Sequence, residues 1–161
     1  MRYLMSHKLF SLGTDFVVKD ESGQDRFVVT RQLLSIGHRL TFRDAAGTAL
    51  LAIQQRLLTF RPTYEILKDG QEVAEVKKQL TFFREEFTID IPGPDDLRVD
   101  GDFLNHEYTI TRGGQPVAQV SKQWFSLVDT YGVDIVPGQD DALILACAVI
   151  VDTINEDAEH H

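Results

Sequence analysis

Apolar and polar residues alternate along this chain in blocks of ten that resemble one another. Five blocks align without a gap, and each has an aliphatic or aromatic residue at positions 1, 4, 8 and 10. Their starts are 24, 24, 23 and 44 residues apart. Repetition at a fixed period indicates one structural unit copied several times. The blocks are LFSLGTDFVV (9–18), LLSIGHRLTF (33–42), LLTFRPTYEI (57–66), LTFFREEFTI (80–89) and WFSLVDTYGV (124–133).

Each unit is predicted to be a β-hairpin. Apolar residues at every second position indicate a strand with one buried face, and the three central positions of each block are a tight connection. Glycine-bearing stretches precede four of the blocks and are typical of the turns that join one hairpin to the next. The last interval is nearly double, and residues 97–112 supply the missing unit in degenerate form. These glycines are Gly23, Gly47, Gly70 and Gly114.

Counting two strands a unit predicts twelve strands joined by sequential hairpins. An open sheet of that size would leave two long unpaired edges, and closure into a barrel removes them. We therefore expect an all-β fold with one helix, in which a twelve-stranded antiparallel barrel closes around that helix. The predicted strands lie near residues 3–12, 15–20, 26–36, 39–44, 49–60, 63–68, 72–83, 86–91, 97–103, 106–112, 116–127 and 130–136.

The predicted helix covers residues 140–154, where residues 142–151 are apolar without interruption. A run hydrophobic on all sides suits a fully buried helix, and it is shorter than the roughly 20 residues that a membrane span needs. Such a helix would fill the wide lumen of a twelve-stranded barrel. A thirteenth strand is the alternative, because Val149, Ile150 and Val151 favour β-structure. We expect one domain over residues 1–154 and a disordered tail over 155–161.

The chain carries a net charge of −9, with a pI near 4.9. Such a charge repels nucleic acid at long range, so nucleic acid is not an expected partner. The single cysteine, Cys147, excludes an internal disulfide framework and a cysteine-based zinc site. The first ten residues contain no apolar stretch of signal-peptide length, and we expect a cytoplasmic protein without a transmembrane segment.

Candidate catalytic residues are few. His7, His38 and His106 fall in three different units without metal-ligand spacing, and we interpret them as strand-end or turn histidines. Cys147 lies within the apolar run, where a thiol is inert. Asp102 and His106 flank a predicted turn, and we interpret them as residues of that hairpin turn and not as a polar site. We therefore predict no enzyme, with no catalytic, cofactor-binding or metal-binding residues.

Two alternatives concern charged residues. Aspartates near Pro92 and Pro94 could bind calcium, but a solvent-exposed connection between two hairpins would also contain such residues. These aspartates are Asp90, Asp95, Asp96, Asp100 and Asp102. A basic residue accompanies every clear repeat and could contact lipid phosphates, but we favour a structural role on the outer surface. These possible phosphate contacts are Lys8, Arg31, Arg56, Lys78 and Lys122. Trp124 replaces the leucine of the other copies and is expected to be buried.

Hairpin repeats followed by GDFLNHEYTI (101–110), SKQWFSLVDTYGVDI (121–135) and a lone apolar helix resemble the LURP-one-related family. That family belongs to the tubby C-terminal-like superfamily, with phospholipid scramblases as cousins. The resemblance implies a twelve-stranded barrel around a central helix. It implies neither the phosphoinositide binding of tubby proteins nor the calcium dependence of scramblases, because no residues here match those sites. We expect a soluble, non-enzymatic binding or scaffold module whose partner is an unknown protein or small ligand. Peripheral binding to phosphoinositide-like or other anionic phospholipid is the alternative, and an enzyme comes third.

Overall fold

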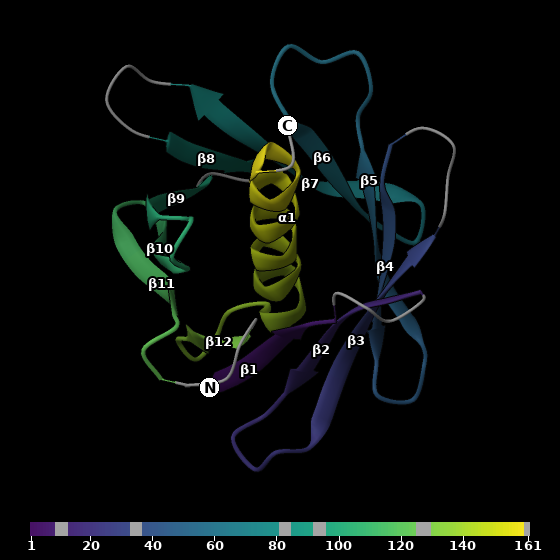
Figure 1. Cartoon of the computed structure of the whole chain (residues 1–161), viewed down its shortest axis with the longest axis vertical. Helices are drawn as coiled ribbons and strands as arrows, with labels where there is room; N and C mark the ends of the chain where they lie inside the picture. Colours follow the sequence, from purple (N-terminus) through teal and green to yellow (C-terminus); the bar gives the residue numbers. More distant parts are fainter. Residues whose placement is uncertain (9–12, 33–36, 81–84, 92–95, 125–129, 160–161) are drawn as a thin grey trace.

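The computed structural model describes residues 1–8, 13–32, 37–80, 85–91, 96–124 and 130–159. Within these residues, twelve antiparallel strands form a closed barrel around one helix (Figure 1). This confirms the predicted fold. The strands are β1 (Arg2–His7), β2 (Thr14–Lys19), β3 (Asp25–Gln32), β4 (Arg39–Asp44), β5 (Ala49–Gln55), β6 (Thr63–Lys68), β7 (Gln71–Leu80), β8 (Glu85–Asp90), β9 (Leu97–Asp102), β10 (Glu107–Arg112), β11 (Gln115–Ser121) and β12 (Thr130–Ile135).

Side chains at alternate positions of each strand point into the barrel. In β1 these are Tyr3 and Met5, both at most 2 % exposed, and the pattern of alternation repeats around the barrel. Burial of this apolar face is the main driving force for the fold, because apolar surface removed from water stabilises by about 25 cal/mol per Å². The two-residue period predicted from the sequence is therefore confirmed.

Consecutive strands pair throughout, and β1 closes the barrel by pairing with β12, with Met5 opposite Tyr131. The glycine turns also appear as predicted. Gly23 and Gly47 have φ angles of 85° and 91°, a left-handed conformation that glycine adopts without strain. In these two turns the side chains of Asp20 and Asp44 accept hydrogen bonds from backbone N–H groups, which fixes the hairpin register.

The helix α1 (Asp141–Glu159) runs through the barrel. Its 19 residues give a rod about 28 Å long. Asp140 caps it, because its carboxylate accepts a hydrogen bond from the Leu143 N–H at 3.2 Å. Residues 143–151 are buried on every side, which agrees with a central plug and excludes a thirteenth strand there. The hydroxyl of Tyr3 donates to the Asp141 carboxylate at 2.6 Å and ties the start of the helix to β1.

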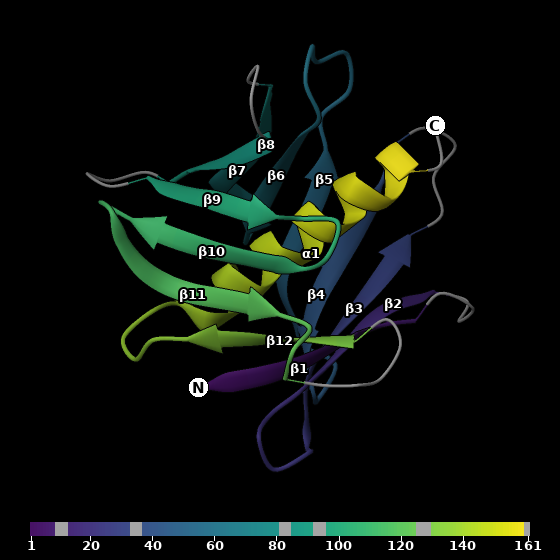
Figure 2. The same ribbon diagram turned by 60° about the vertical axis from the view of Figure 1, so that its left-hand side comes forward.

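The barrel has two different ends. Because neighbouring strands are antiparallel, all odd-numbered strands finish at one end, which we call the loop end. The contact of Tyr3 with Asp141 and the contacts of His7 with Asp152 and Glu156 show that β1 runs alongside α1. The helix therefore begins among the short glycine turns and finishes at the loop end (Figures 1 and 2).

Three details differ from the sequence predictions. Helix α1 extends to Glu159, so residues 155–159 are helical and not a tail; residues 160–161 lie outside the described residues. The predicted strand 49–60 ends at Gln55, and residues 56–60 belong to a loop in which Leu58 has a positive φ of 60°. The predicted strand 116–127 ends at Ser121, and residues 122–124 form a turn; the outer ends of the strands predicted to reach residues 12, 36, 83 and 127 lie outside the described residues.

Trp124 also differs from expectation, since it is half-buried in a turn and not enclosed by the core. The guanidinium of Arg2 lies 4.0 Å from the centre of its ring. This cation–π contact keeps one ring face covered near the barrel surface.

Candidate functional site

Three histidines converge on the last two turns of α1 at the loop end. His7 is the last residue of β1, while His38 and His106 lie in the turns before β4 and β10. Their positions confirm the prediction of strand-end and turn histidines. Their convergence was not predicted. Each ring stacks on an aromatic side chain and directs a ring nitrogen toward a carboxylate of the helix.

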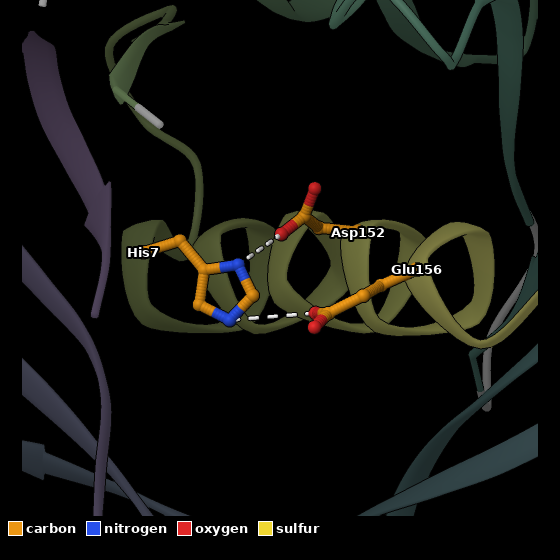
Figure 3. A group of neighbouring side chains, drawn as sticks. All are labelled: His7, Asp152 and Glu156. Atoms are coloured by element: carbon orange, nitrogen blue, oxygen red, sulfur yellow. Dashed lines mark ion pairs between the residues drawn. The ribbon is translucent and has the colours of Figure 1, made fainter. Parts of the chain in front are cut away.

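The ring of His7 lies between two helix carboxylates (Figure 3). Its Nδ1 is 3.3 Å from Asp152 and its Nε2 is 3.4 Å from Glu156, one helical turn further on. Burial lowers the pKa of His7, but the hydrogen bond with Asp152 and the charges of both carboxylates outweigh this effect, so the pKa lies above its ordinary value of 6.5. The geometry therefore favours an imidazolium that joins β1 to the helix.

Asp152 is the centre of the cluster. Its second carboxylate oxygen lies 2.5 Å from Nε2 of His106, whose ring stacks on Tyr131 at 4.5 Å. Burial raises the pKa of Asp152, yet the hydrogen bonds from His106 and His7 lower it by more, and the net pKa falls below 3.8. The carboxylate stays ionised in a buried place because histidines from two sides of the barrel contact it.

His38 completes the set through a chain of four side chains. Arg31 donates to the Asp15 carboxylate at 2.8 Å, and its other guanidinium nitrogen lies 3.2 Å from Nδ1 of His38. An arginine can only donate, so Nδ1 must accept and the ring proton resides on Nε2. Nε2 then donates to the Asp157 carboxylate at 2.9 Å. This chain links β2, β3 and the turn before β4 to the end of the helix.

His7, Asp152 and Glu156 also carry the donor types that a divalent cation binds. One donor atom from each lies within 4.8 Å of the others. Both ring nitrogens of His7 already face carboxylates, however, and a cation would have to displace one of these contacts. The arrangement fits a buried ion-pair network better than a metal centre.

A cavity of about 420 Å³ lies beside this cluster, between the end of α1 and the β5–β6 loop (residues 56–62). Ile154 and Asp157 of the helix line it, together with Tyr64 of β6 and Lys78 of β7. The loop displays large apolar side chains to solvent: Leu58 is 105 % exposed and Phe60 is 99 % exposed. Figure 1 shows this loop extending beyond the barrel near the end of the helix. Exposed side chains of this size beside a cavity are typical of a contact surface.

The five basic residues predicted as possible phosphate contacts all lie at or near the ends of odd-numbered strands, and so toward the loop end. Lys8 and Lys122 are exposed, and Arg31 belongs to the chain described above. Arg56 lies against the carboxylates of Glu65, Glu72 and Glu75 at 3.2–3.4 Å. Lys78 is only 8 % exposed. Arg56 and Lys78 line the same cavity, whereas the other three lie elsewhere around the rim.

The acidic residues considered for calcium are spread over two hairpins. Asp96 raises the pKa of Asp90 through a hydrogen bond and its charge, so these two carboxyl groups lie close together. Asp102 instead accepts hydrogen bonds from the backbone and side chain of Asn105, as expected for a residue of the hairpin turn. Asp95 lies outside the described residues.

Sequence reasoning missed the histidine–carboxylate cluster, although two signals were present. The segment VDTINED (151–157) places polar residues where the helix is still inside the barrel, and buried polar groups require partners. The hairpin plan also puts His7, His38 and His106 at one end, because each lies where an odd strand finishes or an even strand begins. The apolar loop was missed because its residues were assigned to a strand.

Comparison with known proteins agrees with this architecture. The model of a family described as LURP-one-related matches residues 1–152. The chain is 33 % identical over 150 residues to "Uncharacterized protein YxjI" of Bacillus subtilis (strain 168), covering 93 % of this chain and 91 % of that protein. The chain belongs to the LURP-one-related family. The name of the Bacillus protein states no activity for that relative of this LURP-one-related protein.

The fold of this LURP-one-related protein is also found in a plant protein. The X-ray structure of a protein from Arabidopsis thaliana matches with a TM-score of 0.70, at 18 % identity, over 96 % of this chain and 91 % of that one. At this identity the likeness shows the fold alone. Within the described residues, no helix has both the length and the apolar character needed to cross a bilayer.

Proposed function

We propose that this LURP-one-related protein is a non-enzymatic, cytoplasmic binding module that contacts its partner through the loop end of the barrel. The observation that carries the proposal is the pair of fully exposed apolar side chains, Leu58 and Phe60, on the rim of the cavity. Apolar side chains held in water without cover are stabilised when a partner buries them.

The side chains with reactive groups support a binding role over catalysis. Burial raises the pKa of the Cys147 thiol to about 12, which keeps it protonated and unreactive. The three histidines are engaged with carboxylates of α1, where they hold the plug in the barrel. Because these histidines and carboxylates hold the helix in place, their role is consistent with a rigid barrel that binds its partner through an exposed loop.

A photo-crosslinking amino acid at position 58 tests the proposal, with position 136 as the matched control. Val136 is also an exposed apolar residue, but it follows β12 and lies at the opposite end of the barrel. We expect saturable crosslinks to a defined partner from position 58, which the substitution Phe60→Asp abolishes. Equal crosslinking from both positions would contradict contact through the loop end.

Binding to an anionic phospholipid surface is a second candidate, supported by the basic residues that share the loop end with the apolar loop. Apolar side chains can enter the acyl boundary while nearby cations contact headgroups. Flotation with vesicles of phosphatidylcholine and phosphatidylserine tests it. We expect Leu58→Asp to abolish flotation, and added salt to weaken it. Absence of flotation at low salt would eliminate this candidate and leave the protein or small-ligand role.

A further inference from the structure

Within the described residues, His7 is the one histidine of the cluster that has a carboxylate at each ring nitrogen (Figure 3). Nδ1 lies 3.3 Å from Asp152, and Nε2 lies 3.4 Å from Glu156. The ring stacks on Phe16 of β2, with 4.4 Å between the ring centres and 9° between the planes, and this contact holds its orientation. Only the imidazolium can donate to both carboxylates, because a neutral imidazole has one N–H.

The other two histidines are placed to work with a single ring proton. Nδ1 of His38 faces the Arg31 guanidinium at 3.2 Å, which leaves one N–H for Asp157. Nε2 of His106 lies 2.5 Å from Asp152, while its Nδ1 is buried and has no hydrogen-bond partner among the described residues. A second proton on either ring would face a cation or no acceptor there. The surroundings therefore favour the doubly protonated ring at the histidine of β1.

The two carboxylates that face His7 differ in how easily they can reach water. The Asp152 side chain is 9 % exposed and also contacts His106, whereas the Glu156 side chain is 31 % exposed and lies one turn nearer the end of α1. A neutral ring can donate to only one of them, and its other nitrogen then presents a lone pair to the second carboxylate. A buried carboxylate needs its donors more than a partly exposed one. Loss of the proton therefore separates His7 from Glu156 first.

Further charged and titratable groups lie around His7. Burial lowers its pKa, but the Asp152 hydrogen bond and the neighbouring carboxylates, which include Asp15 of β2, raise it by more. Asp15 itself pairs with Arg31 of β3 at 2.8 Å, and Lys8, next in the chain, is exposed to solvent. From β12, on the other side of β1, Tyr131 lies at the same end, and burial raises the pKa of its hydroxyl, which therefore stays neutral.

We propose that His7 is a proton-dependent switch for the last turn of α1, residues 156–159. The imidazolium holds Glu156, and with it this turn, against the barrel. As pH rises and the ring loses its proton, Glu156 is released and the turn unwinds, while Asp152 and the rest of the plug stay in place. The change reaches the cavity beside the β5–β6 loop, because Asp157 of the same turn lines it. This inference goes beyond the proposed function, since it holds whatever binds at the loop end.

The Cα chemical shifts of the full-length protein, measured by NMR at pH 6 and pH 8.5, test the proposal. They report the helical fraction of each segment in the native state, and EDTA in the buffer prevents a divalent cation from replacing the proton. In residues 156–159 the ratio of open to helical forms should rise about fivefold, as loss of one partly exposed ion pair predicts. Residues 144–150 should keep their shifts. The change should follow the titration of the His7 ring resonances, and unchanged shifts in residues 156–159 would overturn the proposal.

Two variants locate the switch. Glu156→Gln removes the carboxylate that the proton holds, so the helical fraction of the last turn should become nearly the same at pH 6 and pH 8.5. His38→Gln is the matched control, because it removes a different histidine contact with the same turn, the one to Asp157. It should lower the helical fraction at both pH values and keep the fivefold ratio. Thermal melts check that both variants fold. A fivefold ratio retained in Glu156→Gln, or lost in His38→Gln, would overturn the assignment to His7.

Discussion

Replacing Asp152 by asparagine should destabilise the protein far more than the same change at an exposed ion pair. The Asp152 side chain is 9 % exposed and contacts both His106 and His7. Removing one partner of a buried pair typically costs about 3–5 kcal/mol, and Glu156 retains part of the interaction with His7, so we expect about 3 kcal/mol. That is a large share of the roughly 5–15 kcal/mol that stabilises a domain.

Asp134→Asn is the matched control. Asp134 pairs with Arg2 at 3.5 Å, but both side chains are more than 40 % exposed, and such pairs contribute less than about 1 kcal/mol. Urea unfolding at pH 6, followed by circular dichroism, gives the free energy of unfolding for each variant. A loss at Asp152 no larger than the loss at Asp134 would refute a holding role for the cluster.

The effect should also depend on pH, in a direction fixed by the two pKa shifts. The pKa of His7 is raised, so its contribution is complete below about pH 6.5 and is lost as pH rises through the folded-state value. The pKa of Asp152 is lowered, so its contribution is present above about pH 3.8 and is lost as pH falls through its folded-state value. The difference between wild type and Asp152→Asn should therefore be largest between about pH 4 and 6.5 and smaller at pH 9. A constant difference over this range would contradict the ion pair.

Three further changes test the barrel and its plug. Ala146→Asp places a carboxylate at a fully buried helix position, and we expect loss of several kcal/mol or an insoluble protein, measured by thermal melting and solubility. Gly101→Ala should cost about 3 kcal/mol in urea unfolding, because φ is +145° and the added Cβ would lie 2.5 Å from the Glu107 carbonyl; Gly47→Ala, with open space around it, should cost about 1–2 kcal/mol. Cys147 should react with a thiol reagent only at the rate of unfolding, and rapid modification of the native protein would show that the helix leaves the barrel.

The barrel could be predicted because its information is local. Alternation within each block, as at Phe16 and Val18, specifies which strand face is buried. Turns that contain an aspartate and a glycine, such as residues 44–47, specify where the chain reverses. The helix could be predicted as far as residue 154, three residues beyond the end of the apolar run at Val151. It continues to Glu159 because Asp152, Glu156 and Asp157 find histidine partners, and those contacts join residues separated by 46 to 149 positions in the chain.

The candidate site was harder to predict for the same reason. Tyr64 and Lys78 are 14 residues apart in sequence, and only strand pairing brings both to the lining of the cavity together with Ile154. The exposed loop shares its apolar composition with a strand, so the pattern LLTF could not distinguish residues that enter the core from residues that face water. Exposure is decided by where the pairing of β5 with β6 ends, at Gln55 and Tyr64, and the apolar pattern does not mark that point.

The closure of the barrel also has a consequence for how the chain is made. β1 is synthesised first, yet its outer edge pairs with β12, and the helix that fills the lumen follows both. During translation the emerging hairpins can form one after another, but their inner faces have nothing to enclose until α1 has left the ribosome. The nascent chain therefore exposes apolar surface for most of its synthesis. The contacts between the first and the last strand join distant parts of the sequence, and such long-range contacts make folding slow. We expect such a chain to depend on holding chaperones during synthesis, and to aggregate when translation stops before residue 141.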